Sequence, residues 1–130
     1  MPYITPMTDT VRIQRDPFDL AAETAKLTRG RSDVGAVVSF TGICRGDENG
    51  EPIAALTLEH YPGMAEAEIE RHVAEARARW PLLGVTVIHR HGRMLPGEDI
   101  VTAVCRFGVW SPMASEIRPS ISRMRVHRRE

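Results

Sequence analysis

The sequence predicts an α+β fold in which helices pack on a mainly antiparallel or mixed sheet. The first observation is the order of the indicated elements: helix, strand, strand, helix, strand and strand. The second is an apolar stripe on the longer helix, formed by Ile69, Val73, Ala76 and Trp80 at helical spacing. The third is size, because a chain of 130 residues that is 42% hydrophobic can bury one core.

Residues 1–34 indicate a short strand and one helix. The strand lies at either Tyr3–Ile4 or Val11–Ile13. The helix begins near Asp16–Asp19, where an aspartate can cap the free amide groups of the first turn, and it ends at Gly30. We expect one side of this helix to face the core, namely Leu20, Ala21, Thr24 and Leu27.

The stretch Gly35–Arg45 is predicted to be a buried strand that runs into a glycine turn and presents an arginine at its end. Val38 and Phe40 favour β-structure. Gly42 permits a tight turn or a close approach of the backbone to a ligand. Arg45 carries a planar set of donors that suits phosphate or carboxylate, so this stretch predicts an anion site.

The rest of the chain is predicted to alternate strands with turns around one long helix. In order, the elements are a polar, mobile loop (46–52), a strand (53–60), a turn (61–64), the helix (about 65–80), a strand (85–90) that continues or bulges at Gly92, a turn (96–99) and a last strand (100–105). Residues 106–130 show no sustained period, and Pro112 and Pro119 interrupt any helix. We therefore expect one domain at residues 1–105 and a divergent, disordered basic tail at residues 106–130.

Composition argues against several classes of protein. The formal net charge is zero, so no overall field favours nucleic acid or a membrane surface. No apolar run approaches the roughly 20 residues that span a bilayer, and Met1–Thr10 lacks the features of a secretion signal. Cys44 and Cys105 are too few for a disulfide framework, so we expect a reduced, cytoplasmic setting.

Five runs of sequence occur in an order and spacing that chance explains poorly. They are Gly35–Gly42 with Arg45, Leu56–Met64, Ala76–Leu82, Val85–Arg90 with Gly92, and Pro96–Val101. Together they resemble the large, catalytic subunit of molybdopterin synthase over about residues 10–105. The run Leu-Glu-His-Tyr-Pro-Gly-Met and the run Val-Ile-His-Arg are the most specific parts of this resemblance.

The resemblance implies an α/β-hammerhead fold and a homodimer within a heterotetramer. Two small ubiquitin-like sulfur-carrier subunits would dock at the ends, each inserting a glycine-ended tail that carries a thiocarboxylate. The implied reaction inserts two sulfurs into cyclic pyranopterin monophosphate and yields the dithiolene of molybdopterin, a step of molybdenum cofactor biosynthesis. No metal and no cofactor are implied.

The resemblance also assigns a substrate site. The arginine after the Phe-Thr-Gly turn lies in the anion-binding pocket of the family, and this position is Arg45 here, with Ile43 and Cys44 beside it. A forked guanidinium is a good partner for the phosphate of the substrate.

The segment Arg106–Pro112 departs from the family pattern. The resemblance implies a His-Arg pair after the last strand and then two lysines, but the pair is absent and Lys26 is the only lysine. Lysine can act as a base or nucleophile when its pKa falls in a pocket, whereas arginine cannot, so the catalytic residues stay unassigned. We hypothesise a frameshift or a recombined 3′ end after about Cys105; the alternative is a degenerate paralogue.

Other interpretations stay open at this point. The chain could be a non-catalytic scaffold that binds partners, or its basic tail could bind nucleic acid. Cys44 could be a nucleophile, or could join Cys105, His60, His89 and His91 in a zinc site. Glu59, His60 and Tyr61 could be acid–base groups, although a structural network at a strand end explains them too.

Overall fold

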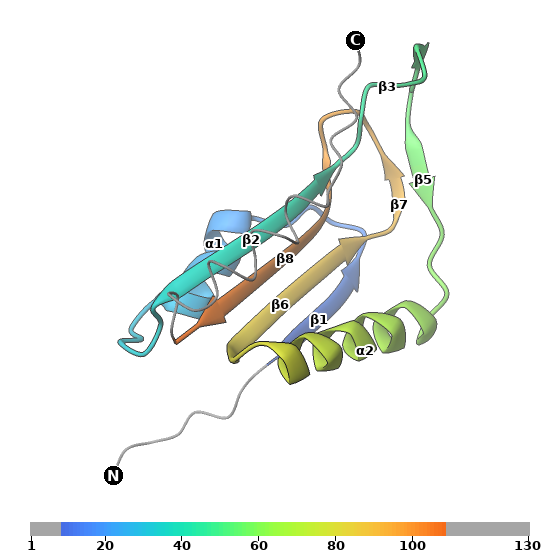
Figure 1. The fold of residues 1–130 in the computed structure, drawn as a ribbon. Helices are drawn as coiled ribbons and strands as arrows, with labels where there is room; N and C mark the ends of the chain where they lie inside the picture. Colours follow the sequence, from blue (N-terminus) through green and yellow to red (C-terminus); the bar gives the residue numbers. More distant parts are fainter. Residues whose placement is uncertain (1–8, 109–130) are drawn as a thin grey trace.

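The computed structural model describes residues 9–108, which form a four-stranded sheet, two helices and two short strand pairs (Figure 1). The elements are β1 (Asp9–Gln14), α1 (Leu20–Thr28), β2 (Ala36–Ile43), β3 (Asp47–Glu48), β4 (Glu51–Pro52), β5 (Leu56–Leu58), α2 (Met64–Arg79), β6 (Leu82–Arg90), β7 (Gly92–Met94) and β8 (Asp99–Phe107). The predicted α+β fold is confirmed.

The main sheet is mixed, with the strand order β1-β6-β8-β2. β1 is parallel to β6, and β8 is antiparallel to both of its neighbours. The predicted strand Val11–Ile13 lies within β1, whereas Tyr3–Ile4 lies outside the described residues. The central positions of β6 and β8 explain why these two strands hold most of the fully buried side chains, including Ile88 and Val104.

Strand β2 lies at an edge of the main sheet, so the prediction of a buried strand was wrong. Phe40 is 47% exposed and Ile43 is 54% exposed. β-Branched and aromatic residues fit a pleated, half-buried surface as well as a buried one, so composition alone does not reveal an edge position. As a result, Ile43 at the end of β2 is open to solvent, as is Arg45 two residues later, whereas Cys44 between them is buried.

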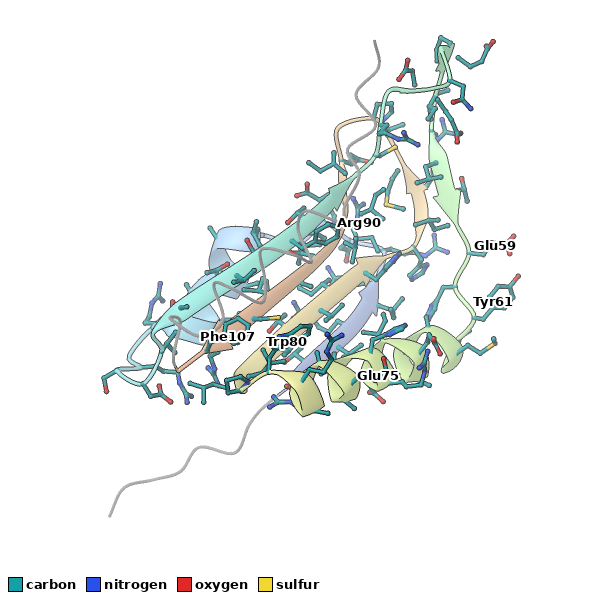
Figure 2. The ribbon with its side chains drawn as sticks, in the orientation of Figure 1. Glu59, Tyr61, Glu75, Trp80, Arg90 and Phe107 are labelled. Atoms are coloured by element: carbon teal, nitrogen blue, oxygen red, sulfur yellow. The ribbon has the colours of Figure 1, made fainter. Side chains whose placement is uncertain are left out.

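Helix α2 forms as the apolar stripe predicts. Glu66 accepts a hydrogen bond from the Gly63 amide at 2.9 Å and so caps the start of the helix. Val73 is buried in one cluster with Leu82, Val85 and Phe107, and the other stripe residues pack against this cluster: Ile69, Ala76 and Trp80. Figure 2 shows Trp80 and Phe107 at the same end of the sheet.

Helix α1 begins at the predicted cap, but its buried face differs from the prediction. Asp19 accepts a hydrogen bond from the Ala22 amide at 3.1 Å. Glu23 and Leu27 are the buried residues of this helix, whereas Ala21 is exposed. The Glu23 carboxylate is held by Arg12 of β1 and by Lys26 at 3.2 Å, so its burial depends on a strand that the helix pattern does not show.

Two short strand pairs, β3–β4 and β5–β7, lie in regions that the sequence predicted as a loop and as single strands. The predicted mobile loop is a hairpin of β3 and β4, with positive φ at Asn49 (51°) and Gly50 (84°), as a type I′ turn requires. β5 covers only Leu56–Leu58 of the predicted strand 53–60. After β6 the chain turns at Gly92 (φ 91°) and forms β7, which pairs with β5 rather than extending the main sheet.

Strand β8 runs two residues beyond its predicted end at Cys105. Arg106 is 2% exposed and Phe107 is 5% exposed, and Phe107 belongs to the core cluster. The first residues of the predicted tail are therefore part of the folded sheet. Pro112, Pro119 and the rest of the predicted tail from residue 109 onward lie outside the described residues, and for them the tail stays a prediction.

Candidate functional site

The candidate anion site lies where β2 ends. The register between β2 and β8 shifts between Gly42 and Ile43. A Cβ atom on Gly42 would lie 2.9 Å from Cγ1 of Val101, so this position needs glycine to keep the two strands together. One further pair, Ile43 with Asp99, follows this irregularity before the chain leaves the sheet.

Backbone hydrogen bonds then fix the segment after β2. The Cys44 amide donates to the Glu98 carbonyl at 2.9 Å, and the Gly97 amide donates to the Cys44 carbonyl at 2.8 Å. Gly97 has a φ of 89° within the predicted turn at residues 96–99. The turn before β8 therefore holds the backbone from which Arg45 projects. The sequence predicted the segment after β2 and the turn at residues 96–99, but it did not predict that the two are in contact.

The three predicted site residues do not share one environment. Ile43 and Arg45 are exposed, whereas Cys44 is 3% exposed and its sulfur lies 3.9 Å from the Met94 carbonyl. Cys44 therefore anchors the segment from inside, while its two neighbours face outward. No side-chain hydrogen bond or ion pair to another residue within 9–108 engages the Arg45 guanidinium, so its donors are open to an anion.

The residues Glu59, His60 and Tyr61 take part in a hydrogen-bonded network between β5 and α2. The Tyr61 hydroxyl donates to Glu59 at 2.5 Å, and this bond raises the pKa of Tyr61. His60 Nε2 lies 3.0 Å from the Glu66 carboxylate at the start of α2. These contacts support the interpretation of the three residues as a network at the strand end. Figure 2 shows Glu59 and Tyr61 pointing away from the main sheet.

The structure brings together only part of the predicted zinc site: the rings of His60 and His91 are 4.7 Å apart between centroids, but the two cysteines lie elsewhere. Cys105 pairs with Val38 in the middle of the sheet, whereas Cys44 lies beyond the far end of β2. His89 is turned to the Arg90 carbonyl, with its Nδ1 at 2.8 Å. Within residues 9–108, no three His, Cys, Asp or Glu side chains are placed to hold a metal ion.

Neither helix in the described part of the chain is long and apolar enough to cross a membrane.

The fold and the site define a small α+β protein that presents an exposed arginine just after its edge strand, with no side-chain partner for it among residues 9–108. The sequence model of the MoaE protein family matches residues 13–107. The chain therefore belongs to the MoaE family, and the resemblance seen in its sequence motifs is confirmed.

Individual relatives agree with this assignment. The molybdopterin synthase catalytic subunit of Mesorhizobium japonicum is 70% identical over 95 residues, which cover 73% of this chain and 58% of the relative. The protein of the same name from Rhizobium meliloti is 62% identical over 92 residues, covering 71% of this chain and 58% of the relative. The chain thus spans less than two thirds of the length of these curated relatives.

A solved structure supports the fold independently. The molybdopterin cofactor biosynthesis protein E of Burkholderia multivorans superposes with a TM-score of 0.70 at 40% sequence identity. The match covers 85% of this chain and 71% of that protein.

Proposed function

We propose that this chain acts in sulfur transfer to a pyranopterin phosphate, as the large-subunit component of a molybdopterin synthase. Membership of the MoaE family supports the reaction class. The observation that carries the proposal is the exposed guanidinium of Arg45, which has no side-chain partner within residues 9–108 and stands on a segment fixed by the turn before β8. This geometry suits the binding of a phosphate group at the end of β2.

In the proposed site, Arg45 holds the substrate phosphate and Ile43 supplies an apolar contact beside it. Cys44 positions both neighbours from the interior without touching the substrate, because its side chain is buried. A forked guanidinium restricts the orientation of a bound phosphate, which places the reacting carbons of the pterin at a fixed distance from the anchor. The sulfur itself comes from the donor and not from a cysteine of this chain.

We further propose that the donor is a small ubiquitin-like subunit with a thiocarboxylated C-terminal glycine, bound to a homodimer of this chain in a heterotetramer. The relatives' name, catalytic subunit, supports the existence of a second kind of subunit. A cytoplasmic location fits, because Cys44 and Cys105 are both free thiols.

The lysine content favours one competing function, a scaffold that binds the partner without turnover. Lys26 is the only lysine in the 130-residue sequence. It lies on α1, where its Nζ donates to the Glu23 carboxylate at 3.2 Å. Lys26 therefore pairs with a carboxylate of its own helix and does not contribute to the site at the end of β2. A reaction that needs a lysine of these 130 residues beside Arg45 would not proceed, although substrate and partner could still bind.

One assay tests both functions. The full chain is mixed with cyclic pyranopterin monophosphate and thiocarboxylated small subunit, and dithiolene formation and subunit binding are measured together. We expect Arg45→Ala to weaken substrate binding by at least about tenfold, because charge-assisted hydrogen bonds are lost. Arg29→Ala is the matched control, since Arg29 is also exposed but follows α1 at the other end of β2.

The outcomes separate the alternatives. Turnover that depends on Arg45 supports the enzyme, and substrate or partner binding without turnover supports the scaffold. Equal behaviour of Arg45→Ala and Arg29→Ala would contradict the proposed role of Arg45. Retention on heparin that disappears when residues 109–130 are removed, which leaves β8 intact, would instead favour the nucleic-acid interpretation.

A further inference from the structure

A polar cavity that Arg45 does not line lies between the end of β1, the pair β5–β7 and the segment before α2. Its volume is about 580 Å³, and nine residues line it: Arg15, Thr57, Leu58, Glu59, His60, Tyr61, His91, Gly92 and Arg93. A cavity of this size accommodates a small organic molecule rather than only a bare ion.

Two arginines bring uncommitted positive charge to this cavity. Six other arginines of residues 9–108 bond to carboxylates or carbonyls within the described part of the chain: Arg12, Arg31, Arg71, Arg77, Arg90 and Arg106. Arg15 and Arg93 have no such side-chain partner within residues 9–108. Their ten N–H donors are therefore available to a ligand.

The backbone fixes where Arg15 stands. Nε of the buried Arg90 donates to the Arg15 carbonyl at 3.0 Å, and the His91 amide donates to the Gln14 carbonyl at 3.0 Å. The Arg15 guanidinium lies over Gly92, because a Cβ atom added there would be 3.5 Å from Arg15 Nη1. These hydrogen bonds hold the end of β1 against the end of β6. They place the Arg15 guanidinium over the start of β7.

Two histidines lie between these arginines and α2. The rings of His60 and His91 are 4.7 Å apart between centroids. Partial burial, His60 and Arg15 together lower the pKa of His91, because a further positive charge is disfavoured there. An anion in the cavity would offset the repulsion from His60 and Arg15, although not the effect of burial. Binding of an anion should therefore favour the protonated form of His91.

The one carboxylate that lines the cavity is already engaged. Glu59 accepts the hydrogen bond of the Tyr61 hydroxyl at 2.5 Å. Both side chains point away from the main sheet (Figure 2), and Glu66, which neighbours His60, also accepts the Gly63 amide. The negative groups near the cavity are thus satisfied by other donors, while the two guanidinium groups are not.

We propose that this cavity binds the phosphate of a small phosphate monoester, with Arg15 and Arg93 as its anchors and His60 and His91 beside the organic part. Guanidinium groups match the geometry of phosphate oxygens. The imidazole rings offer flat surfaces to the remainder of the ligand. The site is separate from the Arg45 site, and it does not depend on the sulfur-transfer proposal.

The experiment is a titration of the full 130-residue chain followed by backbone and histidine NMR signals. Inorganic phosphate and phenyl phosphate are added separately. We expect shifts at His60, His91, Gly92 and Arg93, and tighter binding of phenyl phosphate than of inorganic phosphate. Equal affinities would overturn the assignment to a monoester, and an absence of shifts at these residues would overturn the site.

Variants distinguish this cavity from the Arg45 site. Arg15→Gln and Arg93→Gln should each weaken phenyl phosphate binding by about tenfold, whereas Arg29→Gln should not change it. Both arginines are exposed, and matching circular dichroism spectra check that the variants are folded. Loss of binding in Arg45→Gln, with full binding in Arg15→Gln and Arg93→Gln, would overturn the proposal and leave the Arg45 proposal intact.

A pH series with sulfate tests whether His91 contributes to binding, because a purely structural role of His91 would not make the affinity depend on pH. Sulfate is used because it stays a dianion from pH 5.5 to 7.5. Sulfate binding should strengthen as the pH falls, because His91 gains a proton, and the His91→Gln variant should show a weaker dependence. The charged and titratable groups around His91 are Arg15, Glu59, His60, Tyr61, Glu66, Glu68, His89, Arg90 and Arg93. A flat pH profile in the unmodified chain would contradict the role of His91.

Discussion

The face of the main sheet toward α2 is apolar, whereas the face toward α1 holds charged side chains. On the α2 face, Val73 packs with Leu82, Val85 and Phe107. On the α1 face, Arg12 binds Glu23 of the helix, and buried Arg106, Arg90, Thr86 and Thr102 accompany Ile88 and Val104. Figure 1 shows α1 behind β2 and β8.

This difference teaches that the two faces are stabilised in different ways. Apolar burial is roughly proportional to area and does not depend on direction. A buried charge stabilises only while its partner is present, since removal of one partner leaves the other desolvated. The α2 face should therefore respond to the loss of volume, and the α1 face to the loss of a partner.

The largest effect is expected for Phe107→Ala on the apolar face. Phe107 is 5% exposed in the core cluster, so the variant should lose about 3–5 kcal/mol of unfolding free energy. Phe40→Ala is the matched control. Phe40 is 47% exposed on β2, and its loss should be below about 1.5 kcal/mol. Urea denaturation measures both values.

The same pair of variants tests where the folded domain ends. If residues from 106 onward formed a tail without packing, Phe107→Ala would be as harmless as an exposed substitution. Equal losses for the two variants would therefore refute the core position of Phe107 and the apolar cluster with it.

The next effect concerns the ion pair of the charged face. Arg12→Met leaves Glu23 with Lys26 as its remaining charged partner within the described residues, and it should cost about 2 kcal/mol at pH 7. Adding Glu23→Leu removes the stranded carboxylate, so the double variant should recover most of the loss. A double variant as unstable as the sum of the single ones would show that the pair is not coupled.

The pH dependence of stability gives an independent check on this pair. Burial would raise the pKa of Glu23, but hydrogen bonds from Arg12 and Lys26 outweigh it, and the pKa is lowered from 4.5. The stabilisation is therefore complete above pH 4.5 and is lost as the pH falls through the lowered value. The double variant should lack this component when thermal unfolding is followed between neutral pH and acid.

The contrast between the faces also explains what the sequence could predict. The stripe of α2 repeats at helical spacing, so the apolar face follows from local pattern, and the packing of Ile69, Val73 and Ala76 is confirmed. The buried face of α1 was partly mispredicted because Glu23 is buried only through Arg12, which lies 11 residues earlier on another element. A local pattern carries no information on such a partner.

The candidate sites show the same limit. Arg45 could be proposed from sequence because it directly follows a recognisable strand and glycine turn, although its substrate role stays a proposal. The cavity with Arg15 and Arg93 could not be predicted. Its two arginines come together only because β1 pairs with β6 and β7 turns away at Gly92 to pair with β5.

The smallest effect is expected where a buried charge on the α1 face is incompletely satisfied. Arg106 donates to the Leu27 carbonyl at 3.0 Å and to the Leu83 carbonyl at 3.5 Å, but its Nε has no hydrogen-bond partner within residues 9–108, and burial lowers its pKa. Arg106→Met should therefore be neutral or stabilise by up to about 1 kcal/mol. Arg90→Met is the control, because Arg90 donates to the Arg15 and Asp99 carbonyls, each at 3.0 Å, and its loss should cost about 1–3 kcal/mol. If Arg106→Met lowered the unfolding free energy as much as Arg90→Met, both buried arginines would be needed for stability. An unbonded Nε would then not identify an arginine that can be replaced without loss.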